Sequence, residues 1–298
     1  MTITIAIPTY NRGAILVETI ERLLALEPRA DAIVIADQTK QHPPEVEQRL
    51  RAWHDAGAIR WLRLDTPSIP RSMNDALVAA TTPLVLFFDD DIIPATGIVQ
   101  AHVAAHANAD IWAVAGQVLQ PGQVPQDEQR ATNPLEFHFN STTGAFVNNV
   151  MAGNLSVKRD RALGIGGFDE NFTGAAYRFE TDFAMRIAAA GGKVWFEPRA
   201  SLRHLALSTG GLRSYGDHRS APVPAHSAGD YYFALHHAPR FWPYAARRIV
   251  QNVATRYLAT HPWLIPGKLI GETRGLLLAR KLHRKGRRLR DVHAGRPA

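Results

Sequence analysis

Two kinds of apolar pattern alternate along the first 120 residues of the chain. Short continuous apolar runs are typical of buried strands, and segments in which apolar residues recur every three or four positions are typical of helices. The pattern predicts strands at 2–7, 32–36, 59–64, 84–88 and 112–119, separated by helices at 13–26, 44–56, 72–80 and 96–107. Strands that alternate with helices through short connections form a mainly parallel sheet with helices on both faces. We therefore expect an α/β fold with a Rossmann-like sheet.

The pattern is less regular in the second half of the chain. It predicts a short strand at 154–157, a helix at 181–190 and a strand at 194–196. The segment from Leu205 to Ala228 is rich in Gly, Ser, His and Pro and has little periodicity, which is typical of a functional lid or of a disordered segment. The pattern is helical again from Asp230 to about Arg290. We predict an α/β domain over residues 1–239 and a basic helical extension over residues 240–298.

Charge separates these two parts. The chain has a net charge of +7, but residues 240–298 hold 14 of the 34 Lys and Arg residues and only two of the 27 Asp and Glu residues. Aromatic residues such as Trp242 and Trp263 lie among these basic residues. Basic helices that carry aromatic side chains often lie on anionic membrane surfaces. We expect peripheral membrane contact rather than nucleic-acid binding, and a solvated pair of helices packed on the body is the alternative.

The composition limits which cellular compartment the protein can occupy and which chemistry its side chains can perform. The chain has no cysteine, which excludes disulfides and thiolate chemistry and fits a reducing compartment. No apolar stretch approaches the roughly 18 residues that span a bilayer, and residues 2–8 lack the basic flank and cleavage site of a signal peptide. We therefore expect a cytoplasmic protein that contacts the inner face of the plasma membrane.

Three adjacent carboxylates follow the most apolar predicted strand. The run from Leu84 to Phe88 ends in Asp89, Asp90 and Asp91. Three negative charges at the end of a buried strand repel one another, and a divalent cation would offset this repulsion. Oxygen ligands select a hard cation, Mg²⁺ or Mn²⁺. His204, after the later strand region, is a candidate third ligand of this metal.

Other polar groups are predicted at the same edge of the sheet. They follow the first strand (Thr9, Tyr10, Asn11 and Arg12), follow the second (Asp37), or begin the helix before the fourth (Arg71 and Asn74). Open α/β sheets bind ligands at the carboxyl ends of their strands. Asp37 can accept hydrogen bonds from a base or ribose, and Arg12 or Arg71 can contact phosphates. Neither a P-loop nor a dinucleotide fingerprint is present.

Two further groups of titratable residues lie on predicted helices. Glu180 and Asp182 begin a helix, where they either stabilise its N-terminus or take a proton from a hydroxyl that attacks near a metal-bound phosphate. His102 and His106 are four residues apart, as in zinc sites, but the Glu of the HExxH motif is absent. We interpret this histidine pair as part of an exposed helix face.

Together these residues resemble the family 2 inverting glycosyltransferases, which have the GT-A fold. The resemblance runs from Thr2 to about His237. The segments that carry it resemble the hPTYNR opening (Ile7, Pro8, Thr9, Tyr10, Asn11, Arg12), the second strand with its Asp37, the LPRARN segment (Ile69–Asn74), the DxD motif (Asp89–Asp91), the GxN strand (Gly153, Asn154), the GGFDE and EETD region (Gly167–Glu170, Glu180–Asp182) and the HL and GGxR loop (His204, Leu205, Gly210–Arg213). Met73 and Phe179 depart from the family pattern.

The resemblance implies a role for each matched residue. Glu180 matches the catalytic base, with Asp182 as the second candidate. Gly153 and Asn154 would line the acceptor side, and Asp89, Asp91 and His204 would hold Mn²⁺ or Mg²⁺. The nucleotide-sugar site would comprise Pro8, Thr9, Tyr10, Asn11, Arg12, Asp37, Arg71, Asn74, Asp89, Asp90 and Arg213.

The implied function is metal-dependent, inverting transfer of a sugar from a nucleoside-diphosphate sugar to an acceptor hydroxyl. A bacterial enzyme of this kind would act in cell-surface polysaccharide or glycolipid synthesis, on a glycan or a lipid-linked acceptor. UDP, dTDP and GDP donors all fit the pattern. A non-catalytic nucleotide-binding or scaffold protein of the same fold is one alternative. A sugar-nucleotide nucleotidyltransferase is another, although its Gly-rich phosphate loop is replaced here by residues 8–11.

Overall fold

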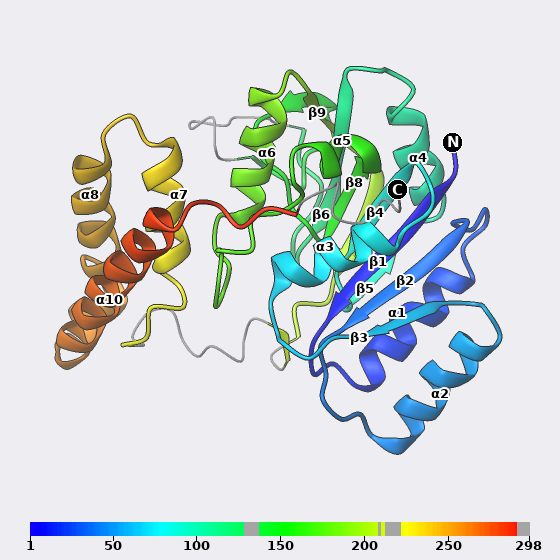
Figure 1. The fold of residues 1–298 in the computed structure, drawn as a ribbon, viewed down its shortest axis with the longest axis horizontal. Coiled ribbons are helices and arrows are strands. Elements are labelled where there is room, and N and C mark those ends of the chain that lie inside the picture. The colour runs from blue at the N-terminus through cyan, green and yellow to red at the C-terminus, as the bar shows by residue number, and fades with distance from the viewer. Residues whose placement is uncertain (128–136, 208–209, 212–221, 291–298) are drawn as a thin grey trace.

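A computed structural model describes residues 1–127, 137–207, 210–211 and 222–290 of the chain. Within these residues one sheet of nine strands forms the centre of the molecule, and helices cover both of its faces (Figure 1). The predicted α/β fold is therefore confirmed. The strands are β1 (Ile3–Thr9), β2 (Ala32–Asp37), β3 (Arg60–Arg63), β4 (Leu84–Phe88), β5 (Ile92–Pro94), β6 (Ile111–Leu119), β7 (Ala145–Val147), β8 (Asn154–Lys158) and β9 (Lys193–His204).

The strand order places the ends of the first four strands at one edge. The order is β3-β2-β1-β4-β8-β6-β9-β5, and β7 pairs with β9. β3, β2, β1 and β4 are parallel, so Thr9 lies opposite Asp37 and Asp37 opposite Arg63. Beyond β4 the directions are mixed, because β8 runs antiparallel to both β4 and β6. The parallel half therefore carries the polar strand ends that the sequence indicated.

Helices form where apolar residues have helical spacing. Leu16, Ile20 and Leu23 are buried on one face of the sheet, and Met73 and Leu77 are buried on the other. These two apolar layers form the core. The helices of the α/β body are α1 (Ala14–Leu24), α2 (Pro44–Asp55), α3 (Ile69–Ala79), α4 (Ile98–Ala105), α5 (Arg159–Gly164) and α6 (Phe179–Ala189).

The structure adds strands that the apolar pattern did not predict. β5 and β7 are three residues each, too short to show a period of two. β9 was predicted only at 194–196 but runs to His204. Polar residues such as Glu197 and Arg199 interrupt its apolar pattern, and backbone pairing with β6 and β5 carries the strand past them.

A layer of helices follows the α/β body. It comprises α7 (Ala228–His237), α8 (Phe241–Val253), α9 (Arg256–Thr260), the 3₁₀ turn η2 (Pro262–Leu264) and α10 (Ile265–Arg284). α7 packs on α8 and α10, so the helical layer includes residues on both sides of the predicted boundary at 239/240 (Figure 1). Across the described part of the chain, every helix is too short or too polar to cross a bilayer.

His102 and His106 correct one expectation. Both are fully buried between α4 and β8, so the prediction of an exposed face was wrong. His102 bonds to Asn154 and Ser156, and His106 bonds to Ser156. Burial lowers the pKa of His102 to about 4 and that of His106 to about 3, so both are neutral at pH 7. The pair therefore holds α4 against β8.

Candidate active site

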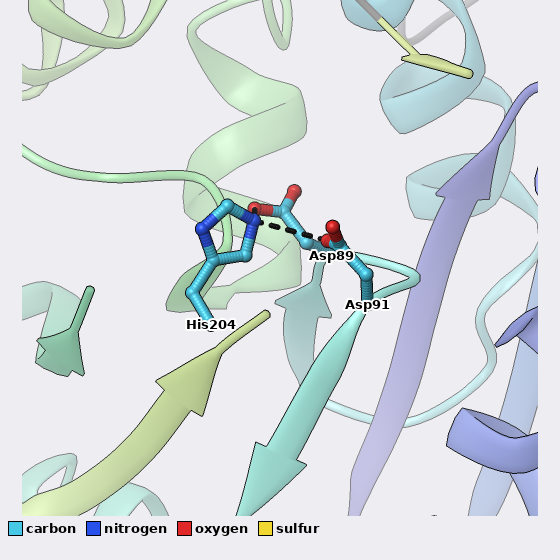
Figure 2. Close-up of side chains that lie close together, drawn as sticks. All are labelled: Asp89, Asp91 and His204. Carbon is cyan, nitrogen blue, oxygen red and sulfur yellow. Dashed lines mark ion pairs between the residues drawn. The ribbon is translucent and has the colours of Figure 1, made fainter. Parts of the chain in front are cut away.

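The structure brings Asp89, Asp91 and His204 together at the predicted edge of the sheet. Asp89 and Asp91 lie in the turn between β4 and β5, and His204 ends β9, so the three side chains converge (Figure 2). One potential ligand atom from each lies within 4.8 Å of those of the other two. His204 Nε2 is 3.0 Å from Asp91 Oδ1 and 3.7 Å from Asp89 Oδ2. Two carboxylates and an imidazole therefore converge on one point.

The donor set fits a divalent cation. Asp91 is buried, and among the described residues its Oδ1 accepts no hydrogen bond of acceptable geometry. His204 Nδ1 lies 2.9 Å from Gln120 Oε1, which only accepts, so Nδ1 carries a proton. The hydrogen bond between Nε2 and Asp91 raises the pKa of His204, so Nε2 would give up a proton when it binds a metal. An outer partner of this kind is the usual companion of a ligating histidine. Gln120 was missed from the sequence, although as the residue after β6 it lies beside the end of β9, where Leu119 pairs with Arg203.

The middle aspartate is held differently from its two neighbours. Asp90 accepts a hydrogen bond from Thr9 Oγ1 at 2.6 Å and pairs with Arg12 Nε at 2.9 Å. Arg12 also lies 3.4 Å from Asp91 Oδ2. Asp90 therefore fixes the end of β1 against the end of β4, and Arg12 balances part of the local negative charge.

Asp37 is already engaged within the protein. Its Oδ1 accepts from the backbone of Thr39, and its Oδ2 bonds to His42 Nε2 at 2.6 Å and Trp61 Nε1 at 2.9 Å. Burial acts to raise the pKa of Asp37, but the hydrogen bonds from His42, Thr39 and Trp61 outweigh it and hold that pKa below its usual value. Asp37 thus remains a carboxylate, and its side chain is fully buried.

The two candidate residues of α3 differ in exposure. Arg71 is half-exposed, with its Nε 3.9 Å from Asp75. Asn74 is buried, donates to the carbonyl of Phe168 and to Glu170, and accepts from the backbone of Phe168. Arg71 is therefore open to a ligand, whereas Asn74 joins α3 to the turn at 166–170.

The residues after β1 meet the chain that follows β9. The amide of Gly211 donates to the carbonyl of Tyr10, and Leu205 donates to the carbonyl of Asp91. Asn11 is exposed and has a left-handed backbone, with φ of 56°. Pro8 pairs with Ala36 in the parallel register. Arg213 lies outside the described residues, as does half of the predicted lid.

Glu180 lies at the start of α6, beside the candidate metal ligands Asp89, Asp91 and His204. Its Oε1 accepts a hydrogen bond from the amide of Ala152 at 2.6 Å. The next residue, Gly153, approaches Asp89 so closely that an added Cβ would lie 2.3 Å from Oδ2. Burial raises the pKa of Glu180 to about 7, and the nearby charge of Asp89 adds to this. The segment 152–153 therefore links Glu180, a carboxyl group whose pKa is about 7, to the candidate metal ligands.

Asp182 has other partners. It is fully buried and bonds to Arg186 at 2.8 Å, His237 at 2.7 Å and Arg287 at 2.6 Å. Burial opposes ionisation, but His237 and the two arginines outweigh it and hold the pKa of Asp182 well below its usual range. Residues two apart on a helix point to different sides. Asp182 thus anchors α6, while Glu180 faces the candidate metal ligands.

Asn154 points into the protein from β8. Its side-chain amide donates to the carbonyls of Gln117 and Ala200, and its oxygen bonds to His102. The side chain therefore ties β8 to β6, β9 and α4, and the neighbouring Gly153 is the residue that lies at the site.

Comparisons with known proteins agree with this architecture. The model of the family described as Glycosyl transferase family 2 matches residues 4–182. A pre-mycofactocin glycosyltransferase of Mycobacterium tuberculosis is 24% identical over 214 residues, which are 68% of this chain and 42% of the relative. The chain thus spans less than half the length of that curated relative.

Two solved structures share the fold. GalNAc-T7, solved with UDP, GalNAc and Mn²⁺, superposes with a TM-score of 0.66 at 13% identity, covering 94% of this chain and 56% of that protein. The mannosyltransferase PcManGT of Pyrobaculum calidifontis, in complex with GDP-Man and Mn²⁺, superposes with a TM-score of 0.56 at 17% identity, covering 94% and 86%. These likenesses show the GT-A fold. Because the family match covers more than half of its residues, the chain belongs to glycosyl transferase family 2.

Proposed function

We propose that this protein is a metal-dependent, inverting glycosyltransferase that uses a nucleoside-diphosphate sugar as donor. The observation that carries the proposal is the meeting of Glu180 with Asp89, Asp91 and His204 across the short segment 152–153. A displacement at a sugar-diphosphate bond needs a base whose pKa lies near 7 and a cation site beside it.

The proposed reaction is a single displacement. The acceptor oxygen forms a bond to the anomeric carbon as the bond from that carbon to the phosphate oxygen breaks, and the nucleoside diphosphate leaves with the electron pair. The acceptor proton passes to Glu180 Oε2, since among the described residues only Oε1 is hydrogen-bonded. A bound Mn²⁺ or Mg²⁺ would neutralise charge on the diphosphate. Attack opposite the leaving group inverts the anomeric centre.

We place the donor along the carboxyl ends of β1, β2 and β4. The buried Asp37 would hold the loop after β2 through Thr39 and His42 at the nucleoside end of the site, and the half-exposed Arg71 is available to a phosphate. The solved relatives with this fold carry UDP with Mn²⁺ and GDP-Man with Mn²⁺ in their structures. A glycan or lipid-linked acceptor would approach from the side of Gly153 and Glu180.

A binding screen tests the donor site directly. UDP, dTDP, GDP and CDP are each added with and without Mn²⁺ while thermal unfolding is followed, because a ligand that binds only the folded state raises Tm. We expect one nucleoside diphosphate to raise Tm, and Mn²⁺ to enlarge the shift. No shift with any of the four would contradict the proposal.

Activity should depend on pH through Glu180. The base must be deprotonated, and its pKa is raised to about 7. The pKa of a base in the free enzyme governs kcat/KM, so kcat/KM should rise with pH through about pH 7 and then level off. The measurement is release of nucleoside diphosphate from the sugar nucleotide at constant ionic strength. A rate that stays flat from about pH 5 to pH 9 would remove Glu180 from the mechanism.

We also infer that the helical layer contacts an anionic membrane from the cytoplasmic side. An apolar groove of about 680 Å³ lies between α8, α9 and α10, and Arg256 is the basic residue in its lining. Exposed apolar side chains occur on α8, η2 and α10: Trp242, Val250, Trp263, Leu269, Ile270 and Leu277. Apolar groups beside basic ones fit the interface of anionic lipid.

Vesicle binding tests this inference. We expect the protein to co-sediment with phosphatidylglycerol vesicles but not phosphatidylcholine vesicles, and Trp242→Ala with Trp263→Ala to weaken the binding. Val78, an apolar residue exposed on α3, provides the control variant Val78→Ala. Equal binding to both kinds of vesicle, or none to either, would contradict an anionic-membrane contact.

A further inference from the structure

Part of the basic C-terminal region turns back onto the α/β body. Residues 285–290, here named the C-terminal strap, leave the end of α10 and run back towards α6 and α3 (Figure 1). The strap carries four basic residues, namely Lys285, Arg287, Arg288 and Arg290. The arginines contact carboxylates of the body, so they are not part of the proposed membrane surface.

Backbone contacts dock the strap against the turn at 166–170. The amide of Glu170 donates to the carbonyl of Arg288, and the amide of Arg290 donates to the carbonyl of Gly166, both at 2.9 Å. Gly166 has φ of 85°, and an added Cβ there would lie 2.7 Å from Leu289. The glycine thus allows the strap to lie directly on the turn.

Ion pairs extend this docking to two helices. Arg287 Nη1 lies 2.6 Å from Asp182 on α6 and 3.3 Å from Asp169. Arg290 pairs with Glu170 at 2.6 Å and with Asp75 on α3. The arginines therefore connect α3, the turn and the first turn of α6.

The contact with Asp182 is the one closest to the proposed chemistry. Asp182 is fully buried. Without Arg287, only Arg186 and His237 would remain as ion-pair partners of the Asp182 carboxylate among the described residues. A buried carboxylate that loses a partner must shift or take up water. Because Glu180 is in the same helical turn, movement of Asp182 would displace Glu180 from the amide of Ala152.

We propose that the C-terminal strap is a positioning element for Glu180, with Arg287 as its principal residue. The proposal rests on the assignment of Glu180 as base. Among the described residues, the side chain of Arg287 contacts Asp169, Asp182 and His237, none of which belongs to the proposed donor site. Arg287 should thus govern turnover while leaving donor affinity unchanged.

Kinetics of Arg287→Ala and Arg287→Lys test the proposal. Misplacement of a reacting group by about 1 Å can cost 10²-fold in rate, so we expect kcat to fall by roughly 10- to 100-fold in Arg287→Ala and to recover in part in Arg287→Lys. The affinity for the nucleoside diphosphate with Mn²⁺ should stay the same. Arg284→Ala, at the exposed last residue of α10, is the matched control and should keep full activity.

Hydrogen exchange provides a readout that does not depend on turnover. The amide of Ala152, bonded to Glu180, should exchange faster in Arg287→Ala, whereas amides of β1 and β2 should not change. An unchanged kcat, unchanged exchange at Ala152, or a fall in kcat matched by an equal loss of donor affinity would each overturn the proposal. Full activity of Glu180→Gln would instead overturn the base assignment itself, so the two failures are distinguishable.

Discussion

Replacing Glu180 with Gln is expected to slow transfer by about 10²- to 10⁴-fold while donor binding survives. Gln keeps the oxygen that accepts from Ala152, so the local hydrogen bond is conserved, but the amide cannot take a proton from the acceptor. A general base contributes about 10²- to 10⁴-fold, and kcat should fall by that order. The measurement is nucleoside diphosphate release at saturating donor, together with donor affinity.

The same variant should be more stable than the wild type at high pH. The pKa of Glu180 is raised to about 7 from 4.5, so the stability of the wild-type fold declines as pH rises between these values. Gln does not ionise, so Glu180→Gln should unfold at a higher Tm above pH 7 and at a similar Tm below about pH 4.5. Glu45→Gln, an exposed carboxylate on α2, is the control for both experiments. Wild-type activity in Glu180→Gln would refute the base assignment.

Replacing Asp91 with Asn should remove the metal dependence of donor binding. Asp91 provides a buried carboxylate oxygen that faces His204 Nε2. Charge neutralisation by a metal contributes several kcal/mol, so kcat/KM should fall on the order of 10³-fold. The Tm shift that Mn²⁺ adds to nucleotide binding should disappear as well.

Gln120→Leu gives a graded version of this experiment. Loss of the outer partner of a ligating histidine typically costs 10- to 100-fold in metal affinity, so this variant should need more Mn²⁺ but reach substantial turnover. Asp110→Asn is the control. Asp110 pairs with Lys193 where β6 and β9 begin, at the ends of these strands that are far from Gln120 and His204. If Asp91→Asn and Asp110→Asn respond alike to Mn²⁺, then Asp89, Asp91 and His204 do not form the metal site.

The sequence predicted what depends on local pattern. Apolar runs located β1, β2, β4 and β6, and the break from Phe88 to Asp89 marked the edge of the sheet. His204 was placed with the aspartates as a candidate ligand, and the structure brings the three together. Strand ends that share an edge follow from strand order, which explains this success.

Long-range partners of polar residues could not be predicted in this way. The roles of His102, Asp182 and the arginines of the strap depend on residues far away in the chain, such as Asn154 for His102 and Arg287 for Asp182. A run of basic residues predicts an exposed surface unless the fold places it against carboxylates. Nothing in the local sequence of residues 285–290 indicates that these residues pack against the carboxylates of the body. Gln120 was likewise hidden, because the pairing of β6 with β9 was not predicted.

The stereochemistry of sugar release tests the central claim most directly. The α-linked sugar nucleotide whose nucleoside diphosphate gives the largest Tm shift is incubated with the protein and Mn²⁺, with water as acceptor, and the first free sugar is followed by proton NMR. The account predicts that the β-anomer appears first, that release needs Mn²⁺, and that Glu180→Gln abolishes it. First appearance of the α-anomer, or release that persists in Glu180→Gln, would contradict a single displacement with Glu180 as base.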